Sequence, residues 1–266
     1  MKYIQLEELK SIQMDVLNTI HMFCENKNIT YSLGCGTMLG AIRHKGYIPW
    51  DDDIDIFMFR NDYDRFISEY PYIINNVKVV SLERDSTWPR AYAQAYNDRT
   101  ILKDGPSKYH VGVGIDIFPI DYVPENDIKW ILFNNIRKLL QCLYDMKYIE
   151  FRKERGLVKN MLLAFSKAVL MPISLRKIAE VIDIHAKKYQ NIKSKFVFDN
   201  SQGSGLMNRF NSNLFEDIID LPFENYIFKG FANFDNYLKN TYGNYMELPP
   251  EEKRISHHDF VAYWKN

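Results

Sequence analysis

Apolar side chains recur at intervals of three and four positions near the start of the chain. The residues concerned are Leu9, Ile12, Val16, Ile20 and Phe23. This spacing places them on one face of a helix, so it predicts an amphipathic helix over residues 4–27. Asn28 is expected to end this helix. A short strand over residues 29–33 is predicted to follow it, and then a turn that contains glycine.

A different period governs the segment that begins at Asp53, where polar and apolar side chains alternate. Ile54, Ile56 and Met58 share one face of the predicted strand, and Asp53, Asp55 and Phe57 share the other. The apolar face is expected to pack on the core. The two carboxylates would then project together from the opposite face.

The rest of the chain mixes both periods. Further strands are expected over residues 77–82, 90–97, 112–118 and 214–229, and further helices over 38–43, 61–70 with Asn61 as N-cap, and 234–242 ended by Gly243. Residues 127–191 show helical periodicity alone, divided by Pro172, and are interpreted as a helical insertion. Residues 1–266 are therefore expected to form one α+β domain with this insertion.

Residues 157–171 are strongly apolar within that insertion. A buried helix is the favoured interpretation, and a helix lying on a membrane surface is the alternative. No run of 18 apolar residues occurs, so no membrane-spanning segment is expected. Peripheral contact with a membrane stays open.

Composition excludes several classes of protein. The chain has 34 basic and 34 acidic residues, and this balance argues against a general nucleic-acid-binding protein. The three cysteines, Cys24, Cys35 and Cys142, fit neither a disulfide framework nor a metal motif. The first residues lack the apolar stretch of a signal peptide. A cytoplasmic protein is expected, with the inner face of the membrane as the alternative location.

The candidate chemistry centres on four aspartates within five positions. Asp51, Asp53 and Asp55 are in phase on the predicted strand, whereas Asp52 faces away. Neighbouring carboxylates raise each other's pKa unless a cation lies between them, and Mg²⁺ or Mn²⁺ is the natural partner for such oxygen ligands. Asp116, which has apolar neighbours on both sides, is the candidate third carboxylate.

A glycine turn and a basic cluster precede the aspartates. Gly36 and Thr37 lie between a short strand and a helix, where backbone N–H groups can approach a phosphate. Arg43 and Lys45 follow and could neutralise a diphosphate. Taken alone, a solvated basic loop is the favoured interpretation of that pair.

These segments resemble the LicD family of bacterial phosphotransferases, which are related to the fukutin-type ribitol-phosphate transferases. The specific match runs through the stretch from Leu33 to Ile56, which contains Gly34-Cys35-Gly36-Thr37 and Pro49-Trp50-Asp51-Asp52-Asp53-Ile54-Asp55. It continues in Arg60-Asn61-Asp62-Tyr63, Ile115-Asp116-Ile117-Phe118-Pro119-Ile120-Asp121, Leu221-Pro222-Phe223-Glu224 and Tyr242-Gly243-Asn244-Tyr245. The resemblance therefore covers nearly the whole chain.

The resemblance implies a nucleotidyltransferase-type mixed sheet flanked by helices. It implies a donor such as CDP-choline or another CDP-activated alcohol, and an acceptor hydroxyl on a teichoic acid, capsule or lipopolysaccharide-type glycan, including a lipid-linked one. Asp53, Asp55 and Asp116 take the places of the metal-binding carboxylates, with Mg²⁺ or Mn²⁺ as cofactor. Asp116 and Asp51 are the rival candidates for the base that receives the acceptor's proton.

Other candidate substrate-binding residues follow from the same resemblance. Arg43, His44 and Lys45 would line the diphosphate or the entrance of the metal site. Trp50 would stack on cytosine, with packing of the loop as the favoured alternative. His257 and His258 could reach the site, and a purely structural pair is the equally weighted alternative.

Two departures from the family pattern stand out. Cys35 occupies a position where members often have a second glycine, and residues 229–234 lack the proline that often introduces the last helix. Two alternative functions stay open beside phospho-alcohol transfer. One is nucleotidyl transfer to a small molecule or protein, and the other is non-catalytic binding of a nucleotide or glycan.

Overall fold

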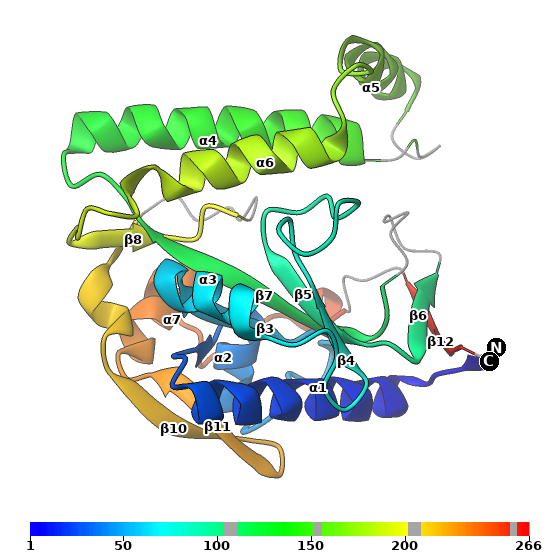
Figure 1. The fold of residues 1–266 in the computed structure, drawn as a ribbon, viewed down its shortest axis with the longest axis vertical. Helices are drawn as coiled ribbons and strands as arrows, with labels where there is room; N and C mark the ends of the chain where they lie inside the picture. Colours follow the sequence, from blue (N-terminus) through cyan, green and yellow to red (C-terminus); the bar gives the residue numbers. More distant parts are fainter. Residues whose placement is uncertain (104–110, 150, 152–155, 202–208, 256–259, 266) are drawn as a thin grey trace.

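The computed structural model describes residues 1–103, 111–149, 151, 156–201, 209–255 and 260–265. A mixed sheet lies at the centre and helices pack around it, so the expected α+β class is confirmed. Helices α4 and α6 form a layer beyond one end of the sheet, and α5 projects from that layer (Figure 1).

The described helices and strands have the following bounds. The helices are α1 (Leu6–Lys27), α2 (Cys35–Arg43), α3 (Arg60–Glu69), α4 (Asp127–Tyr148), α5 (Leu157–Val169), α6 (Leu175–Ala186) and α7 (Phe234–Tyr242), with 3₁₀ turns η2 (Lys187–Tyr189), η3 (Ser212–Phe215) and η4 (Glu251–Lys253). The strands are β1 (Lys2–Tyr3), β2 (Ser32–Leu33), β3 (Asp55–Phe59), β4 (Val77–Val80), β5 (Ala93–Asn97), β6 (Thr100–Lys103), β7 (Gly114–Tyr122), β8 (Phe196–Phe198), β9 (Phe210–Asn211), β10 (Ile218–Phe223), β11 (Tyr226–Phe231) and β12 (Val261–Trp264).

The central sheet has the strand order β2-β3-β7-β5-β4. Strand β3 pairs with β7 in parallel, whereas β2–β3, β7–β5 and β5–β4 are antiparallel. Strands β8 and β9 extend the sheet from the far end of β7. The long strand β7 is therefore the axis to which the two halves of the sheet attach.

Strand β3 is buried on both faces, whereas only one face was expected to pack on the core. Ile56 and Met58 are buried as expected, but Phe57 is buried as well, against Phe118, Phe215 and Tyr237. Helix α7 and the 3₁₀ turn η3 supply two of those rings from the C-terminal part of the chain. The strand also begins at Asp55, so Asp53 lies in the segment that leads into it.

The helix boundaries show where local signals succeed and fail. Asn28 ends α1 in the left-handed conformation, with a φ of 50°, as its position predicted. Helix α2 starts at Cys35, so Gly36 and Thr37 lie in its first turn. Helix α3 starts at Arg60 with Phe59 in the capping position, because the chain passes from β3 into the helix without a loop. The expected N-cap at Asn61 is therefore wrong.

Helices α4, α5 and α6 occupy the stretch in which only helical periodicity was seen, and Pro172 lies between α5 and α6 as expected. The favoured interpretation of residues 157–171 as a buried helix is wrong. Leu163 is the buried residue of α5, whereas Leu162 and Phe165 are 65% and 71% exposed. The helix touches the rest of the protein along one narrow edge. None of the described helices combines the length and the apolar character needed to cross a membrane.

A buried ion cluster joins this helical layer to the sheet. Arg60, at the start of α3, donates two hydrogen bonds to Asp121 of β7, at 2.7 and 2.9 Å. Its third donor reaches Asp183 of α6 at 3.1 Å. The Arg60 and Asp121 side chains are 4% and 0% exposed. One guanidinium therefore neutralises carboxylates from two separate elements.

Replacing Arg60 with methionine is expected to lower the free energy of unfolding by about 3–5 kcal/mol, because Asp121 would stay buried without its cation and Asp183 would keep Lys187 alone. Urea unfolding followed by circular dichroism measures this. Arg65→Met is the matched control in the same helix, since Arg65 is 46% exposed in its ion pairs and such pairs contribute at most about 1 kcal/mol. Equal effects of the two substitutions would contradict the assigned role.

Candidate active site

The parallel pairing of β3 and β7 brings the predicted carboxylates together. Asp55 and Asp116 are direct register partners across the two strands. Their neighbours along the pair, Ile56 with Ile117 and Phe57 with Phe118, are apolar and buried. Two carboxylates thus stand side by side at the end of an otherwise apolar strand pair.

The surroundings of Asp55 disfavour the charged form of its carboxyl group. Loss of hydration raises the pKa of Asp55 well above its ordinary value, and the nearby Asp53 and Asp116 raise it further. A hydrogen bond from the Cys35 side chain acts in the opposite direction. The cluster therefore carries excess negative charge that a bound cation or a proton would relieve.

The glycine turn lies directly under the aspartates. The Thr37 hydroxyl accepts a hydrogen bond from the backbone N–H of Asp55 at 2.8 Å. The backbone N–H of Gly34 donates to the Asp55 carbonyl at 2.9 Å. A Cβ atom on Gly36 would lie 2.8 Å from an Asp51 carboxylate oxygen, so this position has no room for a side chain. Gly36 and Thr37 thus fix where Asp51 and Asp55 stand.

Cys35 adopts a left-handed backbone conformation, with a φ of 44°. This conformation favours glycine, which explains why a second glycine suits the position. In this chain the Cys35 thiol interacts with the Asp55 carboxylate and with Tyr237. The departure from the family pattern therefore adds a contact to the carboxylate cluster.

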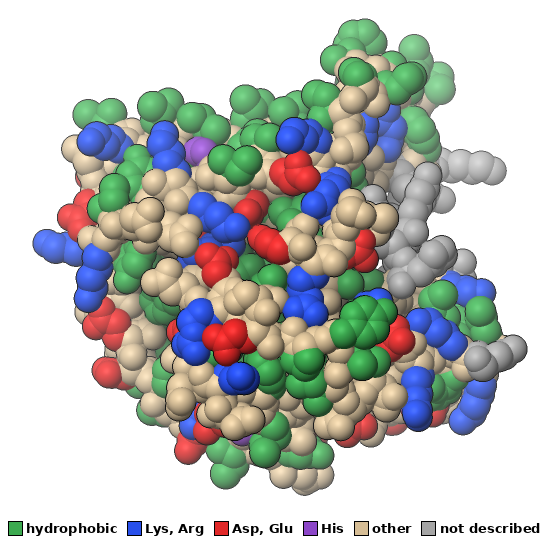
Figure 2. Space-filling model, viewed as in Figure 1, with side chains coloured by type: hydrophobic (Ala, Val, Ile, Leu, Met, Phe, Trp, Pro, Cys, Tyr) green, Lys and Arg blue, Asp and Glu red, His purple; other side chains and the backbone are tan. Residues whose placement is uncertain are grey.

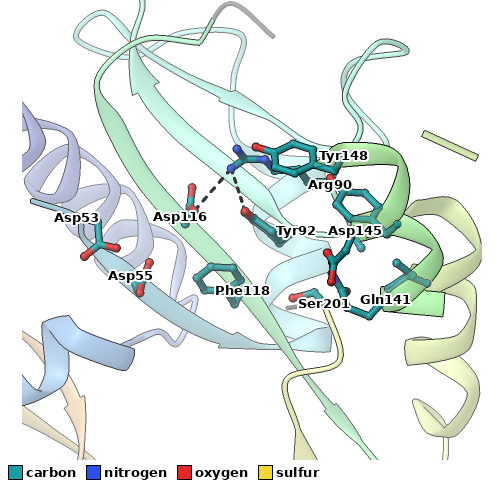
Figure 3. A pocket seen from close by; sticks show the side chains of 13 residues that line it. Asp53, Asp55, Arg90, Tyr92, Asp116, Phe118, Gln141, Asp145, Tyr148 and Ser201 are labelled. Atoms are coloured by element: carbon teal, nitrogen blue, oxygen red, sulfur yellow. Dashed lines mark hydrogen bonds and ion pairs between the residues drawn. The ribbon is translucent and has the colours of Figure 1, made fainter. Parts of the chain in front are cut away.

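A cavity of about 300 Å³ opens beside the carboxylates. Asp53, Asp55 and Asp116 form one end of it, and the inward face of α4 forms the other (Figure 3). Arg90 and Tyr92 lie between the two ends. The chemistry changes along the cavity from acidic to basic and aromatic, and then to acidic again.

Arg90 is the main site residue that the sequence analysis missed. Its guanidinium donates to the Tyr92 hydroxyl at 2.9 Å and lies 3.8 Å from an Asp116 oxygen. Although burial opposes it, the Tyr92 hydroxyl and the Asp116 carboxylate raise the pKa of Arg90. Gln94 donates to the other Asp116 oxygen at 2.9 Å. These contacts hold the Asp116 carboxylate in a single orientation.

The sequence contains a signal for the part of the cavity that Arg90 and Tyr92 line. In the stretch from Arg90 to Tyr96, every second residue is alanine and the residues between are polar or aromatic. Such alternation gives a strand one smooth face and one functional face. The small residues Ala93 and Ala95 pack in the core while Arg90 and Tyr92 line the cavity.

The far end of the cavity comes from α4. Gln141, Tyr144, Asp145 and Tyr148 line it. Loss of hydration raises the pKa of Asp145, and the hydrogen bond from Gln141, 2.9 Å long, acts against that rise. The rings of Tyr144 and Tyr148 stack at 5.8 Å. A carboxylate beside aromatic rings is a favourable setting for an organic cation.

The basic cluster stands apart from this cavity. The Arg43 guanidinium donates to the carbonyls of Tyr245 and Glu247, at 2.6 and 3.2 Å. Burial and the adjacent Arg43 charge lower the pKa of His44, which packs edge-on against Trp50. Lys45 adopts a left-handed turn conformation. Among the described residues that line the cavity, none comes from this cluster.

Distant parts of the chain hold this loop in place. The Glu224 carboxylate, at the tip of the β10–β11 hairpin, accepts a hydrogen bond from the Tyr47 backbone at 2.9 Å. The Glu224 backbone N–H donates to the Lys45 carbonyl at 2.8 Å. From the other side, Gln13 of α1 donates to the Asp52 carbonyl at 2.9 Å. His257 and His258 lie outside the described residues.

Comparison with known proteins adds to this geometry. Residues 28–155 match the family model described as LicD/FKTN/FKRP, nucleotidyltransferase domain. This span contains the glycine turn, Arg90 and the three carboxylates. Residues 28–155 are a nucleotidyltransferase domain of the LicD family.

Individual relatives extend the match beyond this LicD-family domain. It is 29% identical over 266 residues to the lipopolysaccharide cholinephosphotransferase LicD of Haemophilus influenzae, and the match covers 99% of each chain. An uncharacterized protein of Rickettsia typhi is 36% identical over 66 residues, which is 24% of this chain and 21% of that protein. A second, from Rickettsia prowazekii, is 43% identical over 47 residues, 18% of each chain. The full-length match includes the helical layer.

The carboxylates suit a hard divalent cation only in part. Within the described ranges, no three His, Cys, Asp or Glu side chains converge into a complete metal-binding group. Mg²⁺ commonly binds through one or two carboxylates, with waters and substrate phosphates completing its shell. Asp53 and Asp55 can supply such a partial set, and their excess charge favours it. The donor chemistry therefore fits an ion that binds together with a phosphate-bearing substrate.

Replacing Asp55 with asparagine in this LicD-family domain is expected to stabilise the metal-free protein. The folded-state pKa is raised, so the carboxyl destabilises the fold as pH rises above its ordinary value near about 4. The gain should be absent below about pH 4, where the carboxyl is protonated in both states, and should grow as pH rises above that value. Thermal unfolding in EDTA measures it, with the exposed Asp15→Asn as control. A loss of stability at pH 8 would contradict the repulsive cluster.

Proposed function

We propose that this chain transfers phosphocholine from CDP-choline to a hydroxyl of a cell-surface glycan and releases CMP. The proposal draws on the full-length likeness to a protein named as a lipopolysaccharide cholinephosphotransferase. The observation that carries it is the polarity of the cavity, in which Arg90 separates carboxylates at the two ends. Such a cavity complements a molecule that has phosphates in its middle and a cation at one end.

The reaction requires an acceptor oxygen to attack the phosphorus that carries choline. A bond forms between these atoms, and the bond from this phosphorus to the bridging oxygen of the diphosphate breaks. CMP takes the electron pair of the broken bond. The acceptor's proton passes to a base on the protein, so that the acceptor keeps no net charge on its oxygen.

The residues of the chain serve this reaction mainly by positioning and charge compensation. Asp53 and Asp55 would hold Mg²⁺ or Mn²⁺, which would neutralise charge on the diphosphate when bound. Arg90 lines the same cavity as Asp53 and Asp55 and would bind a phosphate oxygen. It forms a fixed link between the carboxylates and the far end of the cavity.

Asp116 is the base that we favour over Asp51. Asp116 lines the cavity, and Gln94 and Arg90 orient its carboxylate. One Asp51 oxygen accepts the backbone N–H of Asp52 at 3.2 Å, and the other lies against Gly36. Asp51 therefore helps to shape the glycine turn, whereas Asp116 faces the cavity.

Replacing Asp53 or Asp55 with alanine should lower the rate of CMP release from CDP-choline with Mg²⁺ by at least about a hundredfold, the usual effect of removing one strong electrostatic contact. Asp52→Asn is the matched control within the same run, and it should keep most of the turnover. Mass spectrometry of the product separates the alternative reaction. An acceptor that carries CMP, with phosphocholine released, would establish nucleotidyl transfer and contradict the proposal.

Asp145 supports choline as the transferred alcohol, because it places a carboxylate beside tyrosine rings at the far end of the cavity. Asp145→Asn should raise the KM for CDP-choline by roughly tenfold, the equivalent of one lost charge contact. The KM for CDP-glycerol or CDP-ribitol, which lack the cation, should change little. Asp127→Asn, at the exposed start of the same helix, is the control. Equal losses for charged and neutral alcohols would contradict this placement of choline.

A further inference from the structure

Helix α5 presents an apolar face that no described part of the protein covers. Val158, Leu162, Phe165 and Val169 follow one another at intervals of three and four positions, which places them on one side of the helix. Each of these side chains is at least 60% exposed. A helix that is apolar on its outer side is unusual in a protein surrounded by water.

The apolar surface continues across the neighbouring helices. Helix α4 packs against both α5 and α6, while its outer side exposes Ile128, Ile131, Leu132 and Leu139. We call this surface the outer helical face, made up of Ile128, Ile131, Leu132, Leu139, Val158, Leu162, Phe165, Val169 and Ile184. Figure 2 shows hydrophobic side chains along the edge formed by α4 and α5, with basic side chains between them.

Charge distinguishes this layer from the rest of the chain. Residues 127–189 contain 13 Lys or Arg and six Asp or Glu, although the chain as a whole is neutral. Lys129, Lys138 and Lys159 are exposed beside the apolar residues. None of the three forms an ion pair with another described residue. Their charges are therefore available to an external partner.

The exposed apolar side chains and the lysines together indicate which partner binds the outer helical face. An exposed apolar helix face with lysines at its border is typical of segments that lie on anionic membranes. A second copy of the chain would bring two basic faces together, and the like charges would repel. Protein interfaces are also depleted in lysine. The surface thus fits an anionic lipid bilayer better than a protein partner.

We propose that the outer helical face docks this protein on the surface of an anionic membrane. The helices lie on the bilayer, with the apolar side chains among the lipid head groups and the lysines against lipid phosphates. Helix α4 contributes to the docking face on one side and lines the cavity on the other. Docking therefore places the cavity within about one helix diameter, roughly 10 Å, of the bilayer.

Flotation of the full chain with lipid vesicles tests the proposal. The chain should bind vesicles that contain phosphatidylglycerol, bind phosphatidylcholine vesicles more weakly, and lose binding as salt rises. Leu162→Glu with Phe165→Glu should weaken partitioning by roughly a hundredfold, since two inserted apolar side chains are lost. The matched control is Tyr72→Glu with Ile227→Glu, two equally exposed apolar residues outside the helical layer. Lys129→Glu with Lys138→Glu should abolish the preference for anionic lipid.

Three results would overturn the proposal. The first is absence of binding to anionic vesicles by the wild-type chain. The second is binding that survives both the apolar and the lysine substitutions. The third is a dimer, measured by light scattering, that dissociates in the Leu162→Glu, Phe165→Glu variant while vesicle binding is unchanged. Because the readout is lipid binding, these outcomes do not depend on the proposed transferase activity.

Discussion

The parallel pairing of β3 with β7 is the constraint on which the rest of the molecule depends. Apolar partners such as Ile56 and Ile117 fill the pair along most of its length, and burial of these side chains supplies the stability that holds it. The register that this packing sets also aligns Asp55 with Asp116. A shift by one residue would move one aspartate to the opposite face of the sheet. The same packing therefore fixes both the core and the carboxylate cluster.

The sheet and the helical layer meet through charge as well as through apolar contact. Arg60 links β7 to α6 through Asp121 and Asp183, and Arg90 links the carboxylate end of the cavity to its middle. Each arginine is surrounded by protein and faces a carboxylate. These contacts leave a cavity between the two layers, where close apolar packing would have filled the space.

Local patterns in the sequence predicted the elements well where one segment decides the outcome. The alternation after Asp53, the turn at Gly36 and the apolar setting of Asp116 pointed to residues that the fold brings together. Arg90 and Asp145 were missed, because their place beside the cavity depends on how β5 and α4 pack. The exposure of α5 was missed for a related reason. Periodicity reports which face is apolar, but not whether another element covers it.

The β10–β11 hairpin, which turns at Glu224, has a consequence for how the protein folds during synthesis. Its carboxylate and backbone hold the loop around Tyr47, and Arg43, the last residue of α2, donates to the carbonyl of Tyr245. During synthesis from the N-terminus, the aspartate segment emerges long before these partners exist. The loop must wait for roughly the last sixth of the chain before its contacts can close, and such distant closures are slow. The loop that leads into the aspartate segment is therefore completed late, after the core strands have been paired.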